Sequence, residues 1–487
     1  MNRDAIANHI SSHTFLNILA NSFRVLVSGI VLIFVARTLG PTQYGIVFLG
    51  LSVAAIAGLF FDFGITTSTA CFLADGKSLN SLIYNNGRFL NLLFSLIFSV
   101  IFFSLSKPIA EFINIGSATY IQIICFLTLV TSLFRFSTKC LQGIKKTDKV
   151  ALLNFVQSLI TNILIFAAAY VGSQAIGILL GHSISWVIIY LTSLLILRKY
   201  FGIFKLHLNM KTLKQIFFYA LPLLVTSSSY FLLLRGPSIL LSAFTSTKEV
   251  SYLHIPLRIV ELISLPAYSL SMVATPFFTK KEQLKGNLSW LYVKIFKYLL
   301  LFYLPITAYL VLSSSRLINV VFGADYIRAA SVLLILSLYL PFFAVTNFSG
   351  TSLDFLGFAK QKSFIFAIAT ACAIICAFLL IPTLKEIGAA LAIAIPYTLF
   401  SIYTIVKSAM ECKVKLRSYI VKLLALLLTV AVSYLLGIVI LFNIEGIIGL
   451  IVSFACFASL FVCLALILRV FNFKEIQNIM NLMKKKK

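Results

Sequence analysis

Long apolar runs separated by short polar turns constrain the fold of this chain more than any other feature of its sequence. Each run is close to the ~20 residues that an α-helix needs to cross a hydrocarbon core of ~30 Å. The chain is 60% hydrophobic and 11% charged, whereas a water-soluble domain is roughly 45–50% apolar and about 25% charged. The sequence therefore predicts an all-α integral membrane protein.

Fourteen transmembrane helices account for the apolar runs. A twelve-span alternative would discard the last two runs, which are as apolar as the others. We expect spans near residues 15–36, 45–70, 89–106, 119–138, 150–171, 175–197, 216–244, 250–278, 295–313, 331–355, 363–381, 388–406, 420–441 and 446–468.

The Lys and Arg residues orient these helices, because cytoplasmic segments of membrane proteins carry an excess of both. With both termini in the cytoplasm, alternate segments hold 31 of the 40 Lys and Arg, and the opposite side holds six. A span missed in mid-chain would break this alternation. The net charge of +26 is therefore mostly a consequence of topology. It does not indicate nucleic-acid binding, since the sequence has no continuous basic face.

The motifs of several enzyme and metal-binding classes are missing from the sequence. The eight Cys are scattered without a CxxC pair or metal-ligand spacing, and no GxxxxGK[ST] loop occurs. The first apolar run is too long for a signal peptide and lacks a small-residue cleavage site, so we expect a retained helix. The longest outward loop, about 314–330, is too short for the outward domain typical of a polysaccharide polymerase or ligase. We expect no cofactor and no enzymatic activity.

Two pairs of weakly similar segments indicate that the chain consists of two related halves. The basic turn LQGIKKTDK (141–149) resembles FLGFAKQKS (355–363), and ARTLGPTQYGIVF (36–48) resembles AFTSTKEVSYLHI (243–255). In each pair the second segment lies about six spans after the first. Because six is an even number, the two halves enter the membrane in the same orientation. Parallel repeats of this kind place a substrate site between the halves. We expect an N-lobe over 1–200 with spans 1–6, a C-lobe over 201–415 with spans 7–12, and a helix pair with a basic tail over 416–487.

Polar side chains at membrane depth are costly and tend to face a cavity or a partner. Spans 1, 2, 7, 8 and 10 carry such residues at spacings of three and four, which place them on one helix face. The site candidates among them are Asn21, Arg24, Asp62, Arg235, His254, Arg258, Glu261 and Asp354. Pro237 is expected to kink the helix that carries Arg235.

Each candidate also has a purely structural interpretation. Arg258 and Glu261 have the spacing of an i,i+3 ion pair, and Asp62 has the charge to pair with Arg24. Other candidates have simple explanations as well: an interfacial Asp354 near Lys360 and Lys362, a snorkelling Arg235, and a His254 satisfied in the core. Arg24 and Arg258 are the strongest functional candidates, because each lies well inside a span near the start of its own half.

Two stretches near the start of the chain resemble the opening signature of Wzx-type polysaccharide flippases. They are ARTLGPTQYGIVFLG (36–50) and FFDFGITTSTACFLA (60–74). VVFGADYIRAASVLLIL (320–336) and the turn FLGFAKQKS that follows it are also similar to this family. The family belongs to the MATE-like superfamily of multidrug, oligosaccharidyl-lipid and polysaccharide exporters, and the resemblance covers essentially the whole chain.

The resemblance implies two six-helix lobes around a central cavity, plus two C-terminal helices beside a groove for a lipid tail. It also implies translocation of undecaprenyl-diphosphate-linked oligosaccharide repeat units across the bacterial inner membrane, for O-antigen or capsule synthesis. Its members bind the diphosphate through basic cavity residues in spans 1 and 8, which Arg24 and Arg258 match by location.

An Arg-lined cavity suits a diphosphate, because a guanidinium stays charged and donates bidentate hydrogen bonds to phosphate oxygens. We expect Arg24 and Arg258, with Arg235, to bind this group. Asp62 and Glu261 would neutralise the arginines or couple transport to H⁺ or Na⁺. Two alternative functions remain open, a multidrug antiporter of the same superfamily and a lipid II flippase. The expected partners are the lipid-linked oligosaccharide, membrane lipids and other polysaccharide-assembly proteins.

Overall fold

The computed structural model describes residues 3–74, 80–202, 204, 208–274, 288–414, 429–435 and 446–467. Within these ranges every regular element is a helix, and no strand occurs. This confirms the all-α fold expected from the apolar runs.

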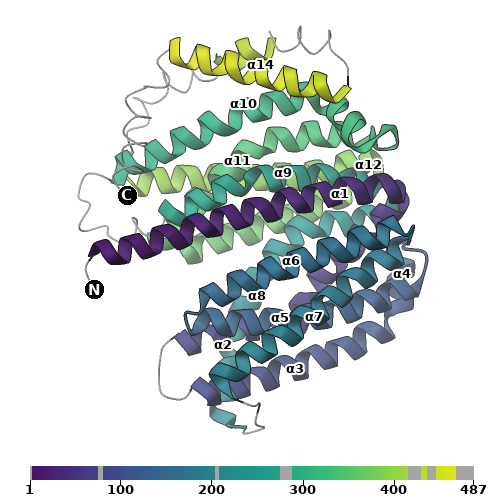
Figure 1. Ribbon diagram of the computed structural model, residues 1–487, viewed down its shortest axis with the longest axis vertical. Coiled ribbons are helices and arrows are strands. Elements are labelled where there is room, and N and C mark those ends of the chain that lie inside the picture. The colour runs from purple at the N-terminus through teal and green to yellow at the C-terminus, as the bar shows by residue number, and fades with distance from the viewer. Residues whose placement is uncertain are drawn as a thin grey trace. The chain divides into compact units, whose positions relative to one another are not determined.

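The described helices follow the expected spans closely. In the first part of the chain they are α1 (Arg3–Asp62), α2 (Ile65–Ala74), α3 (Asn80–Ser104), α4 (Ser106–Phe112), α5 (Ala118–Gly143), α6 (Thr147–Tyr170), α7 (Ala175–Phe201), α8 (Met210–Phe244) and α9 (Thr247–Ala274). They continue with α10 (Leu288–Phe322), η2 (Ala324–Tyr326), α11 (Ala329–Phe355), α12 (Ala359–Glu411) and α14 (Gly446–Ile467). Figure 1 shows their order along the chain.

Ten of the described helices are long and apolar enough to cross a membrane, or eleven if the two parts of α8 form one span. Two of these helices each cover two expected spans, because the chain breaks inside them. Gly40 interrupts α1 with a φ of 71°, immediately before Pro41, and Lys385 interrupts α12 with a φ of 50°. The count of fourteen stays a prediction, since the span expected at 420–441 is described only at 429–435, where it is helical.

Helix α8 contains a bend of 47° between Leu224 and Ser228. The hydroxyl of Ser228 donates to the carbonyl of Leu224 at 2.7 Å, and such i−4 bonds from serine bend helices. The bend therefore precedes Pro237, the residue at which the sequence predicts a kink, and α8 continues through that proline to Phe244.

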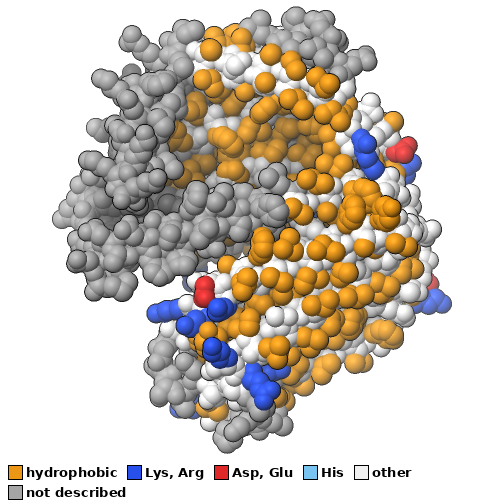
Figure 2. All heavy atoms as spheres, viewed as in Figure 1, with side chains coloured by type: hydrophobic (Ala, Val, Ile, Leu, Met, Phe, Trp, Pro, Cys, Tyr) orange, Lys and Arg blue, Asp and Glu red, His pale blue; other side chains and the backbone are white. Residues whose placement is uncertain are grey.

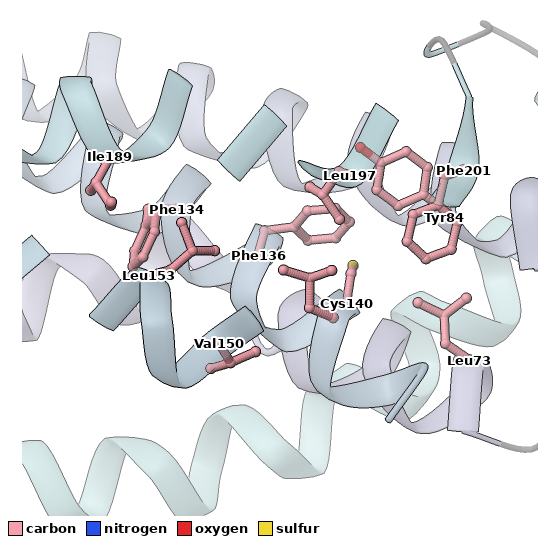
Figure 3. Packing of buried hydrophobic residues seen from close by; sticks show 11 residues of the cluster. Leu73, Tyr84, Phe134, Phe136, Cys140, Val150, Leu153, Ile189, Leu197 and Phe201 are labelled. Carbon is pink, nitrogen blue, oxygen red and sulfur yellow. The ribbon is translucent and has the colours of Figure 1, made fainter. Parts of the chain in front are cut away.

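Aromatic and aliphatic side chains from α2, α3, α5, α6 and α7 form a common core. Its buried members are Leu73, Tyr84, Phe134, Phe136, Cys140, Leu141, Val150, Leu153, Ile189, Leu197 and Phe201 (Figure 3). The rings of Tyr84 and Phe201 stack with centroids 4.3 Å apart. Since Tyr84 lies near the start of α3 and Phe201 is the last residue of α7, this contact joins two helices that are distant in sequence.

Large apolar side chains also cover the outer faces of the helices. On α3, Val100 is 67% exposed, and on α6, Ile163 is 65% exposed. Figure 2 shows hydrophobic side chains spread over this face, with Lys and Arg gathered toward its edges. A surface of this kind is unfavourable in water and is what a lipid-facing surface requires.

The chain divides into two compact units that do not follow its order. We call Asn17–His254 with Phe366–Ile393 the N-terminal unit, and Met1–Leu16 with Ile255–Ile365 and Ala394–Lys487 the C-terminal unit. Every passage between them falls inside a helix, namely α1, α9 or α12. The three-part division at 1–200, 201–415 and 416–487 stays a prediction.

Candidate functional site: a charged cavity in the N-terminal unit

A cavity of about 470 Å³ lies within the N-terminal unit, at the break between α1 and α2. It is lined by Gly58, Leu59, Asp62, Gly64, Thr67, Arg135, Leu223 and Phe231. Its volume falls within the range of about 300–1,000 Å³ that is typical of small-molecule sites. Two of the lining residues, Gly58 and Gly64, are glycines, and two others, Asp62 and Arg135, carry opposite charges.

The turn between α1 and α2 positions Asp62 at this cavity. Phe63 and Gly64 both have positive φ angles, 50° and 75°, which end α1 and allow the chain to restart as α2. Only glycine fits at position 64, because a Cβ there would lie 2.5 Å from the carbonyl oxygen of Ala220. The turn thus brings α2 against α8 while Asp62 remains at the end of α1.

Hydrogen bonds from α2 hold the Asp62 carboxylate. Its Oδ1 accepts from the backbone N–H of Thr66 at 3.2 Å and from the hydroxyl of Thr66. This is the geometry of an N-terminal cap, in which a carboxylate satisfies a free N–H of the first turn. Among the described residues, Arg135 and Lys139 of α5 lie within electrostatic range of Asp62. The pairing of Asp62 with Arg24 falls on a side chain outside the described residues.

Arg135 is a cavity residue that the sequence analysis missed. It counted there among the cytoplasmic positive charges at the end of the span expected at 119–138, and its place in α5 (Ala118–Gly143) was not used. The guanidinium of Arg135 lies over the ring of Phe231, 5.9 Å from its centroid. Its four-residue spacing from Lys139 would have placed both cations on one helix face, and this was the signal available in the sequence.

Arg258 and Glu261 form an ion pair in the C-terminal unit. The Arg258 Nη1 and Glu261 Oε2 atoms are 3.1 Å apart, and both side chains are about one-third exposed, at 36% and 34%. The two residues lie one turn apart on α9, so their spacing alone brings them together. The guanidinium expected to bind diphosphate therefore already has a carboxylate partner on its own helix.

His254 is buried where the start of α9 meets the second half of α1. Its Nδ1 lies 3.4 Å from the hydroxyl of Tyr44, and its ring stacks on Phe48 with centroids 3.6 Å apart. A Cβ added at Gly45 would overlap the carbonyl oxygen of Thr247. The absence of a side chain at Gly45 is therefore what allows the two helices to approach this closely.

The remaining candidates are not among the residues that line this cavity. Asp354 pairs with Lys362 in the C-terminal unit, near the turn between α11 and α12. Arg235 is partly buried on α8, one turn beyond Phe231. The side chains of Asn21 and Arg24 lie outside the described residues. No group of three or more His, Cys, Asp or Glu that could hold a metal ion occurs among the residues the structure describes.

Comparison with known proteins gives the family. The family model for polysaccharide biosynthesis proteins matches residues 11–282, which is more than half of the chain. The chain belongs to this family. The family expected from the two N-terminal stretches is thus confirmed. A curated relative, an uncharacterized membrane protein of Methanocaldococcus jannaschii, is 25% identical over 225 residues. That match covers 45% of this chain and 44% of the relative.

Solved structures show that this member of the polysaccharide biosynthesis family has the fold of membrane flippases and transporters. The lipid II flippase MurJ in an inward closed conformation matches 93% of this chain and 99% of its own, with a TM-score of 0.74 and 17% identity. An inward-facing multidrug resistance MATE transporter of the MOP superfamily matches 80% of this chain and 94% of its own, with a TM-score of 0.65 and 17% identity. A MOP superfamily transporter from Pyrococcus furiosus matches 82% and 95%, with a TM-score of 0.55 and 16% identity.

Proposed function

We propose that this protein is a flippase that moves a lipid-linked oligosaccharide across a membrane by alternating access. The match to the polysaccharide biosynthesis family over residues 11–282 carries the proposal. The cargo we propose is an undecaprenyl-diphosphate-linked repeat unit, the membrane is the bacterial inner membrane, and the product is a surface polysaccharide such as O-antigen or capsule. Both termini would lie in the cytoplasm.

The shared fold supports a lipid-linked cargo. MurJ is named as a lipid II flippase, and its structure aligns with nearly the whole of this chain. The MATE neighbours, which align with a smaller share, are named as multidrug transporters. The proposal therefore takes a polar head group attached to a lipid as the cargo, and the drug-transport alternative becomes an outcome of the test.

In the C-terminal unit, we propose that the diphosphate replaces Glu261 as the anionic partner of Arg258. A diphosphate offers a guanidinium bidentate acceptors, as the carboxylate of Glu261 also does. Because the Arg258–Glu261 pair is one-third exposed, an incoming diphosphate can reach the guanidinium and displace Glu261. Arg24 and Arg235 are proposed to bind the same group, and H⁺ or Na⁺ is proposed to couple the cycle.

Mass spectrometry of prenyl-diphosphate lipids tests the proposal. Cells with the gene deleted would be complemented with the wild type, Arg258→Gln, Arg258→Glu or the control Lys199→Gln. Lys199 is exposed in the last turn of α7, so its replacement removes one positive charge without touching the pair. Protein levels in the membrane would be matched by immunoblot.

We expect the deletion to accumulate a complete lipid-linked repeat unit, which the wild type and Lys199→Gln clear and Arg258→Glu does not. If lipid II alone accumulates, the cargo is lipid II and not the lipid-linked oligosaccharide. An unchanged lipid pool together with altered drug retention would refute the flippase and favour a multidrug antiporter. Normal clearance by both Arg258 variants would remove Arg258 from the mechanism while leaving the flippase intact.

A further inference from the structure

Among the residues that the structure describes, none uses the hydrogen-bonding capacity of the Arg135 guanidinium. An arginine side chain carries five N–H donors, and within the described residues that of Arg135 forms no hydrogen bond and no ion pair. It lies over the face of Phe231, 5.9 Å from the ring centroid. An aromatic face holds a guanidinium by its charge and leaves the in-plane donors available.

The nearby carboxylate does not occupy these donors. Asp62 is hydrogen-bonded to the backbone and side chain of Thr66, and its interaction with Arg135 is electrostatic at longer range. In contrast, Arg258 is bound directly to Glu261 at 3.1 Å. Arg135 is therefore charge-compensated without being chemically paired, which is the state in which a cation can accept an anionic ligand without first losing a partner.

The surroundings of Arg135 provide room and a second positive charge. The cavity of about 470 Å³ that it lines also exposes Thr67, a hydroxyl donor, and Gly58, which leaves space beside the helix. Lys139 follows one turn later on α5 and is within electrostatic range of the same carboxylate. Arg135 and Lys139 therefore place two positive charges near the same carboxylate.

We propose that Arg135 binds a phosphate group of the transported lipid head group in this cavity, with Lys139 as the supporting charge. The proposal rests on the proposed function for the identity of the cargo, and it adds Arg135 and Lys139 to the residues proposed to bind the head group. Phosphate oxygens match the planar fork of a guanidinium in geometry as well as charge. Asp62 would limit the affinity, because a bound anion faces its negative charge, and this favours release as well as capture.

Binding of farnesyl diphosphate to the purified, detergent-solubilised protein tests this site without requiring transport. Isothermal titration would compare the wild type with Arg135→Gln, Arg135→Lys, Asp62→Asn and the control Lys145→Gln. Lys145 is exposed just beyond the end of α5, so the control removes the same charge from the same end of the helix. Farnesol and inorganic pyrophosphate, titrated separately, distinguish the tail from the head group. Size-exclusion profiles establish that each variant is folded.

We expect Arg135→Gln to weaken farnesyl diphosphate binding by about tenfold or more, since hydrogen bonds to a charged group are lost. Arg135→Lys should retain part of the affinity, Asp62→Asn should raise it, and Lys145→Gln should leave it unchanged. Pyrophosphate should compete and farnesol should not. A general loss of structure would not weaken binding in Arg135→Gln while strengthening it in Asp62→Asn.

Wild-type affinity in Arg135→Gln, or an equal loss in Lys145→Gln, would overturn the site. An absence of diphosphate binding to the wild type would overturn it as well. The lipid analysis of deleted cells decides the proposed function separately. If the deleted cells accumulate the oligosaccharide lipid but Arg135→Gln binds the diphosphate normally, the flippase function stands and the Arg135 site is wrong. If Arg135 binds the diphosphate but no lipid accumulates, the site stands and the flippase function is wrong.

Discussion

Three glycines of α1 provide a graded test of how closely its second half packs. A Cβ at Gly45 would overlap the backbone carbonyl oxygen of Thr247 in α9, which moves only if the helices separate. At Gly50 the obstacle is the tip of the Ile124 side chain at 2.7 Å, and at Gly58 the nearest atom is a methyl group at 3.9 Å. Alanine at the three positions should therefore destabilise the fold in that order.

The size of the effect follows from terms that the three variants share. Each Gly→Ala change gains about 1 kcal/mol of helix propensity, so this contribution cancels when the variants are compared with one another. Overpacking a tight contact costs about 1–3 kcal/mol, which is the difference we expect between Gly45→Ala and Gly58→Ala. Gly50→Ala should fall between them, because a flexible side chain can change rotamer.

Thermal unfolding in detergent, followed by circular dichroism, would measure this order. Gly58→Ala should unfold at or above the wild-type temperature, and Gly45→Ala clearly below it. Equal midpoints for Gly45→Ala and Gly58→Ala would refute the close approach of α1 and α9. The same result would also remove the basis for the contacts of His254 with Tyr44 and Phe48 described above.

Three further substitutions test contacts within the two units. Tyr292→Phe removes a hydroxyl 2.6 Å from that of Ser408. The loss of unfolding free energy should be about 0.6–1.7 kcal/mol, as for other buried hydrogen bonds in membrane proteins. A double-mutant cycle with Ser408→Ala should show coupling between the two residues, and additive effects would contradict the hydrogen bond. Tyr309→Phe breaks a 2.7 Å hydrogen bond to a carbonyl of α14, and faster proteolysis around that helix would reveal it. Phe201→Ala should lose about 3–5 kcal/mol of stability through the cavity it leaves beside Tyr84, whereas a loss below 1 kcal/mol would place this ring outside the core.

Much of the fold was predictable because lipid imposes a simple length rule. Each expected span overlaps described helix, the one at 420–441 only over 429–435. Gly40 before Pro41 marks the break inside α1 from the sequence itself. The break at Lys385 in α12 was predictable only as a short polar turn, since a lysine at a φ of 50° has no local signature. The bend of α8 also lies between Leu224 and Ser228, before Pro237, where the sequence carries no proline to mark it.

The candidate site was less accessible to sequence reasoning, for physical reasons. Arg258 and Glu261 could be paired on spacing alone, but the partner of Asp62 depends on a turn with two positive φ angles. Arg135 lines the cavity because residues of α1, α2 and α8 pack beside it, far from it in sequence. The neighbours of His254 lie 210 residues away at Tyr44, and no local pattern connects residues so distant. Contacts between distant helices are set by packing, which one sequence does not display.

The helices that pass from one unit to the other limit how this protein can be taken apart. The chain changes unit after Leu16, His254, Ile365 and Ile393, each time in mid-helix. A gene cut anywhere between residues 17 and 393 therefore encodes fragments that complete neither unit. Expressing an isolated half, a common first step with internally repeated proteins, would leave helix ends without their neighbours. Fragments of this protein should accumulate only when both pieces are made in the same cell and assemble there.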